Sequence, residues 1–148
     1  MAVCLSYSIT YGQIVISEIM YNDPGTADSL EYIELTNASA QAVDLTGYSF
    51  SAGVKYTFPA ITLGPGQQIL VAKDSVYVLA ALGKAARQWK SGDALNNSGE
   101  KITLQDAGGT GVDSVSYSDS NGWPTEADGD GYSLVLCDLL SDNNLPSS

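Results

Sequence analysis

The sequence predicts an all-β chain folded as a sandwich of about eight or nine mostly antiparallel strands, with one short helix near residues 75–82. Runs of β-branched and aromatic residues recur about every ten residues, and Gly- and Pro-rich turns separate them. No long helical pattern lies between these runs. Nine Tyr and fifteen Gly are typical of strands joined by frequent turns.

The opening strand pair organises the rest of the chain. Residues 14–21 are β-branched or aromatic nearly throughout, which predicts a strand buried on more than one side. Pro24 and Gly25 end this strand in a turn, and residues 31–36 return along it. In the return strand, the period of two places Ile33 and Leu35 on one face, and Tyr32 and Glu34 on the other.

Four further segments have the pattern of strands. Residues 43–50 alternate with an interruption at Gly47, which we interpret as a bulge, and Pro59 ends a strand at 54–58. A short strand at 61–63 leads into the turn Gly64-Pro65-Gly66, and the apolar run at 68–72 predicts a buried strand.

The helix begins after a cap at Asp74 or Ser75 and ends before Gly83. Its spacing predicts that one face buries four apolar residues, namely Val76, Leu79, Ala80 and Leu82.

The remaining strands are expected at 101–105, 112–117 and 132–137, and the first two form a hairpin around residues 106–111. We therefore expect one sandwich domain over residues 13–140, followed by a linker or tail at 141–148. Residues 1–12 are apolar and rich in small residues. They are either the remnant of a secretory signal peptide or a disordered or edge-strand N-terminus.

The charge and residue content exclude several classes of function. A net charge of −11 argues against nucleic acid and anionic lipid as partners. All six basic residues lie within residues 55–101. The simpler interpretation is charge scattered over surface loops, and the alternative is a mildly basic patch around Lys84, Arg87 and Lys90. Without histidine, there is no Ser–His or Cys–His triad and no ordinary zinc site.

Cysteine does not identify the redox compartment. Cys4 and Cys137 are the only thiols. A single pair so distant in sequence is no disulfide framework, and Cys4 is lost if the signal peptide is cleaved near Gln13.

Several segments, in order over residues 14–136, resemble the lamin tail domain family and its bacterial branch. These are ISEIMYN (16–22), EYIELTN (31–37), VDLTGYSF (43–50), YTFPAITLGPGQQILV (56–71), ALNNSGEKITLQDAGG (94–109), VDSVSY (112–117), GWP (122–124) and ADGDGYSL (127–134). The resemblance implies an immunoglobulin-like sandwich, similar to the tail of intermediate filament lamins, with an accessory or interaction role and no catalytic residues. The segment SDNNLPSS (141–148) resembles the Asp/Asn-rich continuation of bacterial members, which implies a longer polypeptide.

Three groups of residues could carry chemistry. Glu126, Asp128 and Asp130 resemble the first half of a calcium loop, to which Asp23 and Asp28 could add oxygens, but an acidic β-turn is the simpler interpretation. Glu18, Glu31 and Glu34 could supply the carboxylate pair of a glycoside hydrolase, although outward-facing charge is the default for strand residues. Backbone N–H groups could instead hold Glu34 as a structural anchor. Trp89 and Trp123 could form an aromatic platform for sugars or close the ends of the core.

The function expected is a non-catalytic interaction or structural module of an exported or cell-surface protein, monomeric in isolation, with no cofactor. The alternative is a carbohydrate-binding or calcium-assisted adhesion module, and a carboxylate-based hydrolase comes third. The partner is then a protein or a surface glycan, and no segment is long and apolar enough to span a bilayer.

Overall fold

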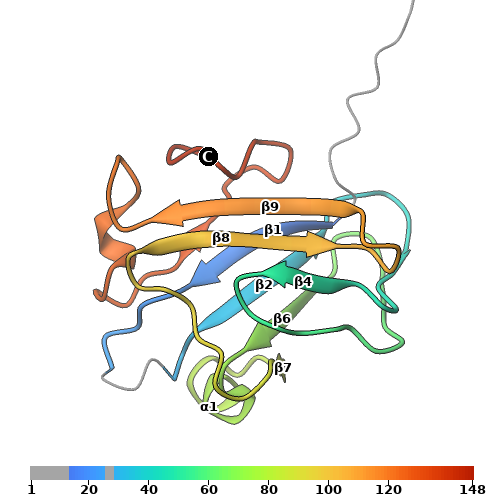
Figure 1. Ribbon diagram of the computed structural model, residues 1–148, viewed down its shortest axis with the longest axis horizontal. Helices are drawn as coiled ribbons and strands as arrows, with labels where there is room; N and C mark the ends of the chain where they lie inside the picture. The colour runs from blue at the N-terminus through green and yellow to red at the C-terminus, as the bar shows by residue number, and fades with distance from the viewer. Residues whose placement is uncertain (1–13, 26–28) are drawn as a thin grey trace, which may run out of the picture.

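Two β-sheets face each other in the computed structural model, which describes residues 14–25 and 29–148 (Figure 1). The larger sheet has the order β10-β1-β2-β6-β7, and only its β6–β7 pair is parallel. Its strands are β1 (Ile14–Met20), β2 (Tyr32–Asn37), β6 (Gln68–Ala72), β7 (Ala86–Gln88) and β10 (Leu134–Val135).

The facing sheet contains β4 (Ser49–Ala52), β8 (Gly99–Gln105) and β9 (Gly111–Ser118), in that order. A third, two-stranded sheet pairs β3 (Val43–Asp44) with β5 (Thr62–Leu63). The helix α1 (Ser75–Leu82) and a 3-10 turn, η1 (Thr125–Ala127), complete the described elements. This architecture confirms the predicted all-β, immunoglobulin-like sandwich with one short helix, although the described residues form ten strands.

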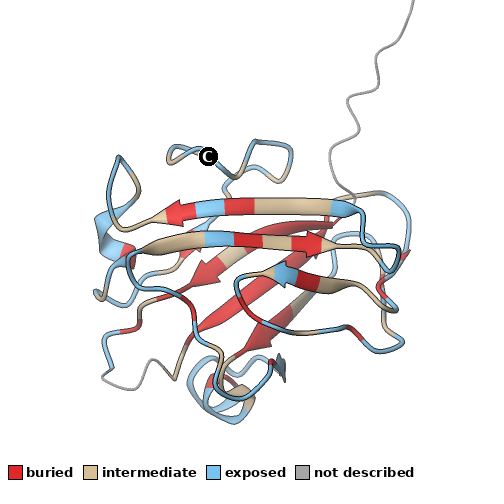
Figure 2. Cartoon of the chain, in the orientation of Figure 1, coloured by how far each residue is buried: buried red, intermediate tan, exposed pale blue. Residues whose placement is uncertain are grey.

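The main core fills the space between the two sheets, and buried residues run along β1, β2 and β6 (Figure 2). The alternation in β2 is as predicted, since Ile33 and Leu35 belong to this core while Tyr32 faces the other way. A second, smaller cluster lies on the outer face of the larger sheet, under α1. It consists of Met20, Tyr32, Leu70, Ala72 and Val78, with Leu30 and Ala86 packed against it.

The ends of α1 are those expected from the sequence, but its buried face is different. The Asp74 carboxylate accepts the backbone N–H groups of Val76 and Tyr77, and Gly83 ends the helix with φ of 68°. Only Val78 is buried among the helix residues. The expected inward face is therefore wrong, because the exposed side chains include Val76, Leu79, Ala80 and Leu82.

Three strand predictions need correction. The segment 43–50 is two strands in different sheets, because the turn at Gly47, with φ of 79°, redirects the chain. Residues 54–58 form only a single bridge between Thr57 and Ser49. The last strand is shorter than expected, and β7 has no counterpart in the prediction.

The N-terminal segment 1–12 lies outside the described residues, as does Asp28. At the other end, residues 141–148 pack back onto the sandwich. The Asn144 amide donates to the Ser114 carbonyl at 2.7 Å, and its oxygen accepts the Ser116 N–H at 2.8 Å. The division of the chain into signal remnant, domain and tail stays a prediction.

Candidate functional site

The three glutamates of the carboxylate hypothesis do not form one site. Glu18 and Glu34 are direct cross-strand partners of β1 and β2, on the outer face of the larger sheet. Glu31 precedes β2 with the parity of Ile33, so it lies toward the opposite face. The structure thus brings together two of the three candidate carboxylates.

Glu34 is 2% exposed, so the expectation that strand carboxylates point into solvent is wrong for it. Its Oε1 accepts hydrogen bonds from the Ser17 hydroxyl at 2.9 Å and the Gln68 amide at 2.8 Å. Its Oε2 lies 3.5 Å from the Lys84 ammonium. Because a buried carboxylate needs such partners, these contacts fit a structural anchor, although it is held by side chains and not by the backbone N–H groups that were expected.

Glu18 and Glu31 are also held by neighbouring groups. The Glu18 carboxylate accepts hydrogen bonds from the hydroxyls of Tyr32 and Ser133. Glu31 is fully buried; one oxygen accepts from the Lys73 ammonium and the other from the Leu95 backbone N–H, each at 2.7 Å. Glu31 therefore ties the start of β2 to the loop that precedes β8.

The acidic segment 126–131 is a turn on the surface. Glu126, Asp128 and Asp130 are exposed, and the Asp128 carboxylate accepts a hydrogen bond from the Asn22 amide at 2.7 Å. Asp23 accepts the N–H groups of Gly25 and Leu30. Within residues 14–25 and 29–148, no three Asp, Glu, Cys or His side chains are grouped to hold a metal ion. Calcium binding at this turn stays a prediction.

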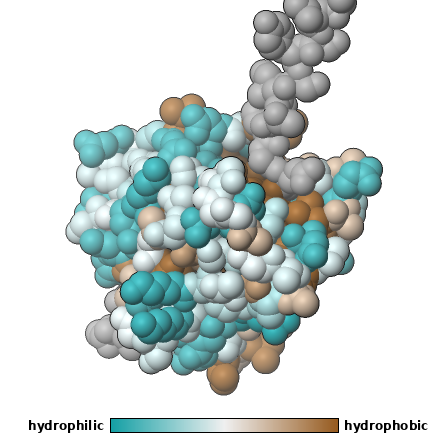
Figure 3. All heavy atoms as spheres, turned by 45° about the vertical axis from the view of Figure 1, so that its right-hand side comes forward, coloured by the Kyte–Doolittle hydropathy of each residue, from teal (hydrophilic) through white to brown (hydrophobic). Residues whose placement is uncertain are grey.

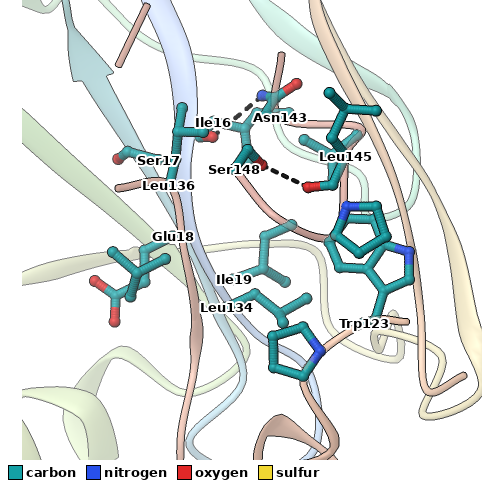
Figure 4. A pocket seen from close by; sticks show the side chains of 14 residues that line it. Ile16, Ser17, Glu18, Ile19, Trp123, Leu134, Leu136, Asn143, Leu145 and Ser148 are labelled. Atoms are coloured by element: carbon teal, nitrogen blue, oxygen red, sulfur yellow. Dashed lines mark hydrogen bonds between the residues drawn. The ribbon is translucent and has the colours of Figure 1, made fainter. Parts of the chain in front are cut away.

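The two tryptophans lie in different surroundings. Trp89 is 3% exposed in the main core, and its indole N–H donates to the Asp93 carbonyl at 2.9 Å, so its ring offers no stacking surface to solvent. Trp123 is half-buried and lines an apolar cavity of about 50 Å³ with Leu134 and Leu145 (Figure 4). Ligand pockets are typically about 300 Å³ or larger, so this cavity is too small for a sugar ring.

The sequence did not predict an exposed apolar surface at the end of the molecule where α1 lies. Four side chains of the helix are exposed there: Val76 (74%), Tyr77 (49%), Leu79 (52%) and Leu82 (41%). A few hydrophobic spheres project at the lower end of the molecule in Figure 3, at the height of α1 in Figure 1. The sequence nevertheless contains an indication of this surface. Every residue from 76 to 82 is apolar or aromatic, and a helix that buries one face must leave some of them exposed.

Cys137 is exposed and forms no disulfide within the described part of the chain. The helix α1 is eight residues long, and no helix among the described residues has the length and apolar character needed to cross a bilayer.

Comparison with known proteins agrees with the sandwich architecture. No curated protein matches the chain. A family model described as Lamin Tail Domain matches residues 8–119, which is more than half of the chain and includes β1 through β9. The lamin tail domain is an immunoglobulin-like, non-catalytic type of domain that suggests an interaction or structural role. The chain belongs to the lamin tail domain family.

Proposed function

We propose that this domain is a non-catalytic interaction module of an exported or cell-surface protein, and that it binds a protein partner. The single observation that carries this proposal is the exposed apolar surface of α1. Exposed apolar groups gathered in one place are typical of surfaces that bind other molecules. The carboxylates that a hydrolase would use are, in contrast, held by internal hydrogen bonds and ion pairs.

Export is proposed from the apolar, small-residue composition of residues 1–12. It is tested by fractionating cells that produce the tagged protein and by determining the N-terminus of the exported form. Cleavage near Gln13 supports export, whereas an intact protein retained in the cytosol contradicts it.

The interaction role is tested against the carbohydrate and calcium alternatives. A glycan array and a calcium titration followed by thermal melting should give no binding and no shift in melting temperature. Since a ligand that binds only the folded state raises the melting temperature, a clear shift with calcium would instead support an adhesion module. Binding to a glycan would do the same for the carbohydrate alternative.

A further inference from the structure

The open side of the sandwich between β1 and β9 is covered by side chains. The Asp113 carboxylate accepts the Ile16 backbone N–H at 2.7 Å, and the Asn143 amide donates to the Ile16 carbonyl at 3.3 Å. Asn144 engages Ser114 and Ser116 of β9 on the edge away from β8. These amides take the place of a neighbouring strand along β9 and along the part of β1 that β10 does not pair, which protects both from pairing with another chain.

The edge of the larger sheet at β7 has no such cover. The backbone N–H of Trp89 donates to the Ala72 carbonyl of β6. Because every second residue of a strand directs its N–H and C=O groups to the same side, the N–H and C=O of Arg87 also point to β6. The N–H and C=O groups of Ala86 and Gln88 therefore point away from the sheet. Across residues 14–25 and 29–148, these outward groups have no hydrogen-bond partner.

The two sides of this edge differ in chemistry. Ala86 and Gln88 lie on the side of α1, since Ala86 packs against the cluster under the helix and the Gln88 amide oxygen accepts the Ser75 hydroxyl at 3.1 Å. The apolar side chains of α1 are exposed on this side. In Figure 1, α1 and β7 lie together at the lower end of the molecule.

The opposite side of β7 carries positive charge. Arg87 is exposed there; burial raises the pKa of Tyr56, and the nearby Arg87 charge partly offsets that rise. Lys55, which precedes Tyr56 in sequence, is also exposed, and its backbone carbonyl accepts the Lys90 N–H. The Asp93 carboxylate accepts the Lys55 N–H at 2.9 Å.

We propose that the β7 edge accepts an extended segment of a partner protein as an added strand, in which apolar residues facing α1 alternate with acidic residues facing Arg87. The backbone of the segment pairs with Ala86 and Gln88, and the period of two in a strand sends its side chains alternately to the two flanks. This inference rests on the proposed function, because it names the partner of the interaction module. A second copy is disfavoured, since two chains of net charge −11 repel each other.

The test uses three synthetic peptides and the full chain. One peptide of about eight residues alternates Val and Glu, the second alternates Val and Lys, and the third has the Val/Glu composition with its residues in two blocks. The Val/Glu alternating peptide should bind, with protection of the Ala86 and Gln88 amides from hydrogen exchange. N-methylation of alternate peptide nitrogens on the pairing edge should abolish binding, because it removes the donors of the added strand.

Two protein variants locate the site. Ala86→Pro removes an outward N–H at the first residue of β7, a position that tolerates proline, without removing a β6–β7 hydrogen bond. Binding should be lost while the melting temperature changes little. Arg87→Glu should weaken binding about tenfold, whereas Lys101→Glu on β8, with the same charge change, should leave it within about twofold.

Each result decides the proposal. Failure of the alternating Val/Glu peptide to bind, equal binding of the Val/Lys or block peptide, or amide protection at β10 in place of β7 would overturn it. Concentration-dependent self-association that Ala86→Pro abolishes would assign the edge to a second copy and would also overturn it. These outcomes leave the glycan and calcium results unchanged, so the broader interaction role is judged separately.

Discussion

Two tyrosines in contact in the core provide a matched test of buried hydroxyl groups. The Tyr21 and Tyr117 rings have centroids 4.7 Å apart, and both side chains are at most 3% exposed. The Tyr117 hydroxyl donates to the Asn96 carbonyl at 2.8 Å and lies 3.3 Å from a Glu100 carboxylate oxygen. The Tyr21 hydroxyl has no hydrogen-bond partner in the described part of the chain. The same Tyr→Phe change should therefore have opposite effects at the two positions.

The expected magnitudes follow from these contacts. Tyr117→Phe removes a buried hydrogen bond and leaves the Asn96 carbonyl without its partner, so it should lower the free energy of unfolding by about 1–2 kcal/mol. Tyr21→Phe removes a hydroxyl that was desolvated without compensation, so it should raise the free energy of unfolding by up to about 1 kcal/mol. Both rings keep their packing, since phenylalanine has the same ring.

Urea unfolding followed by far-UV circular dichroism measures both changes, and thermal melting gives a second readout. For a domain of this size, about 1 kcal/mol corresponds to a melting shift of roughly 2–4 °C. The double variant should show how far the two effects add, because the rings touch. If Tyr21→Phe destabilises the domain as much as Tyr117→Phe does, the Tyr21 hydroxyl has a partner, and the reasoning fails.

Three further outcomes are expected. Glu31→Gln should cost about 2–3 kcal/mol by urea unfolding, because one of the two donors to the buried carboxylate loses its acceptor. The exposed Glu126→Gln should change stability by less than about 0.5 kcal/mol. Gly99→Ala should cost roughly 2–4 kcal/mol in the same assay, because Gly99 has φ of 106° and a Cβ there would lie 2.5 Å from the Tyr117 carbonyl oxygen. Equal stability of wild type and either costly variant would contradict these contacts. Burial and nearby carboxylates raise the pKa of Tyr21 to about 12. The folded state thus keeps a proton that the unfolded state releases near pH 10, and stability should fall as pH rises through this interval. Unfolding titrations should show a smaller fall in Tyr21→Phe.

The sequence predicted the strands whose side chains alternate between a core and another surface. In β2 and β8, β-branched or apolar residues recur at the period of a strand, whereas β6 was predicted from its continuous apolar run. The register confirms all three elements. The cap of α1 was also predictable, since Asp74 and Gly83 act on backbone groups only a few residues away. Such features depend on local chemistry, which the sequence contains.

The features missed depend on contacts between distant segments. The apolar run at 68–72 did not show which of its residues face the main core: Val71 occupies the inward position, and Leu70 faces the cluster under α1. Val78 is buried because it is the helix residue that faces the outer surface of the larger sheet. Nearly every residue of α1 is apolar, so the periodicity of its sequence cannot show which face is buried. Ala86–Gln88 has no alternating pattern, and it becomes a strand only because β6 offers a parallel edge.

The edges of the sheets explain why the candidate interaction surface was the hardest feature to predict. On the β1/β9 side, Asn143 and Asn144 come from a segment that resembles a polar tail, yet their amides complete the hydrogen bonding of strands that are about thirty or more residues away in sequence. At β7, the backbone N–H and C=O groups of Ala86 and Gln88 point outward without a partner in the described part of the chain, between the exposed apolar side chains of α1 and Arg87. An uncovered strand edge is an aggregation hazard, and this chain covers one edge with two asparagines. That it leaves the β7 edge open therefore indicates that the open edge has a function. Binding of an added strand at β7 is the use that fits both its backbone and its two flanks.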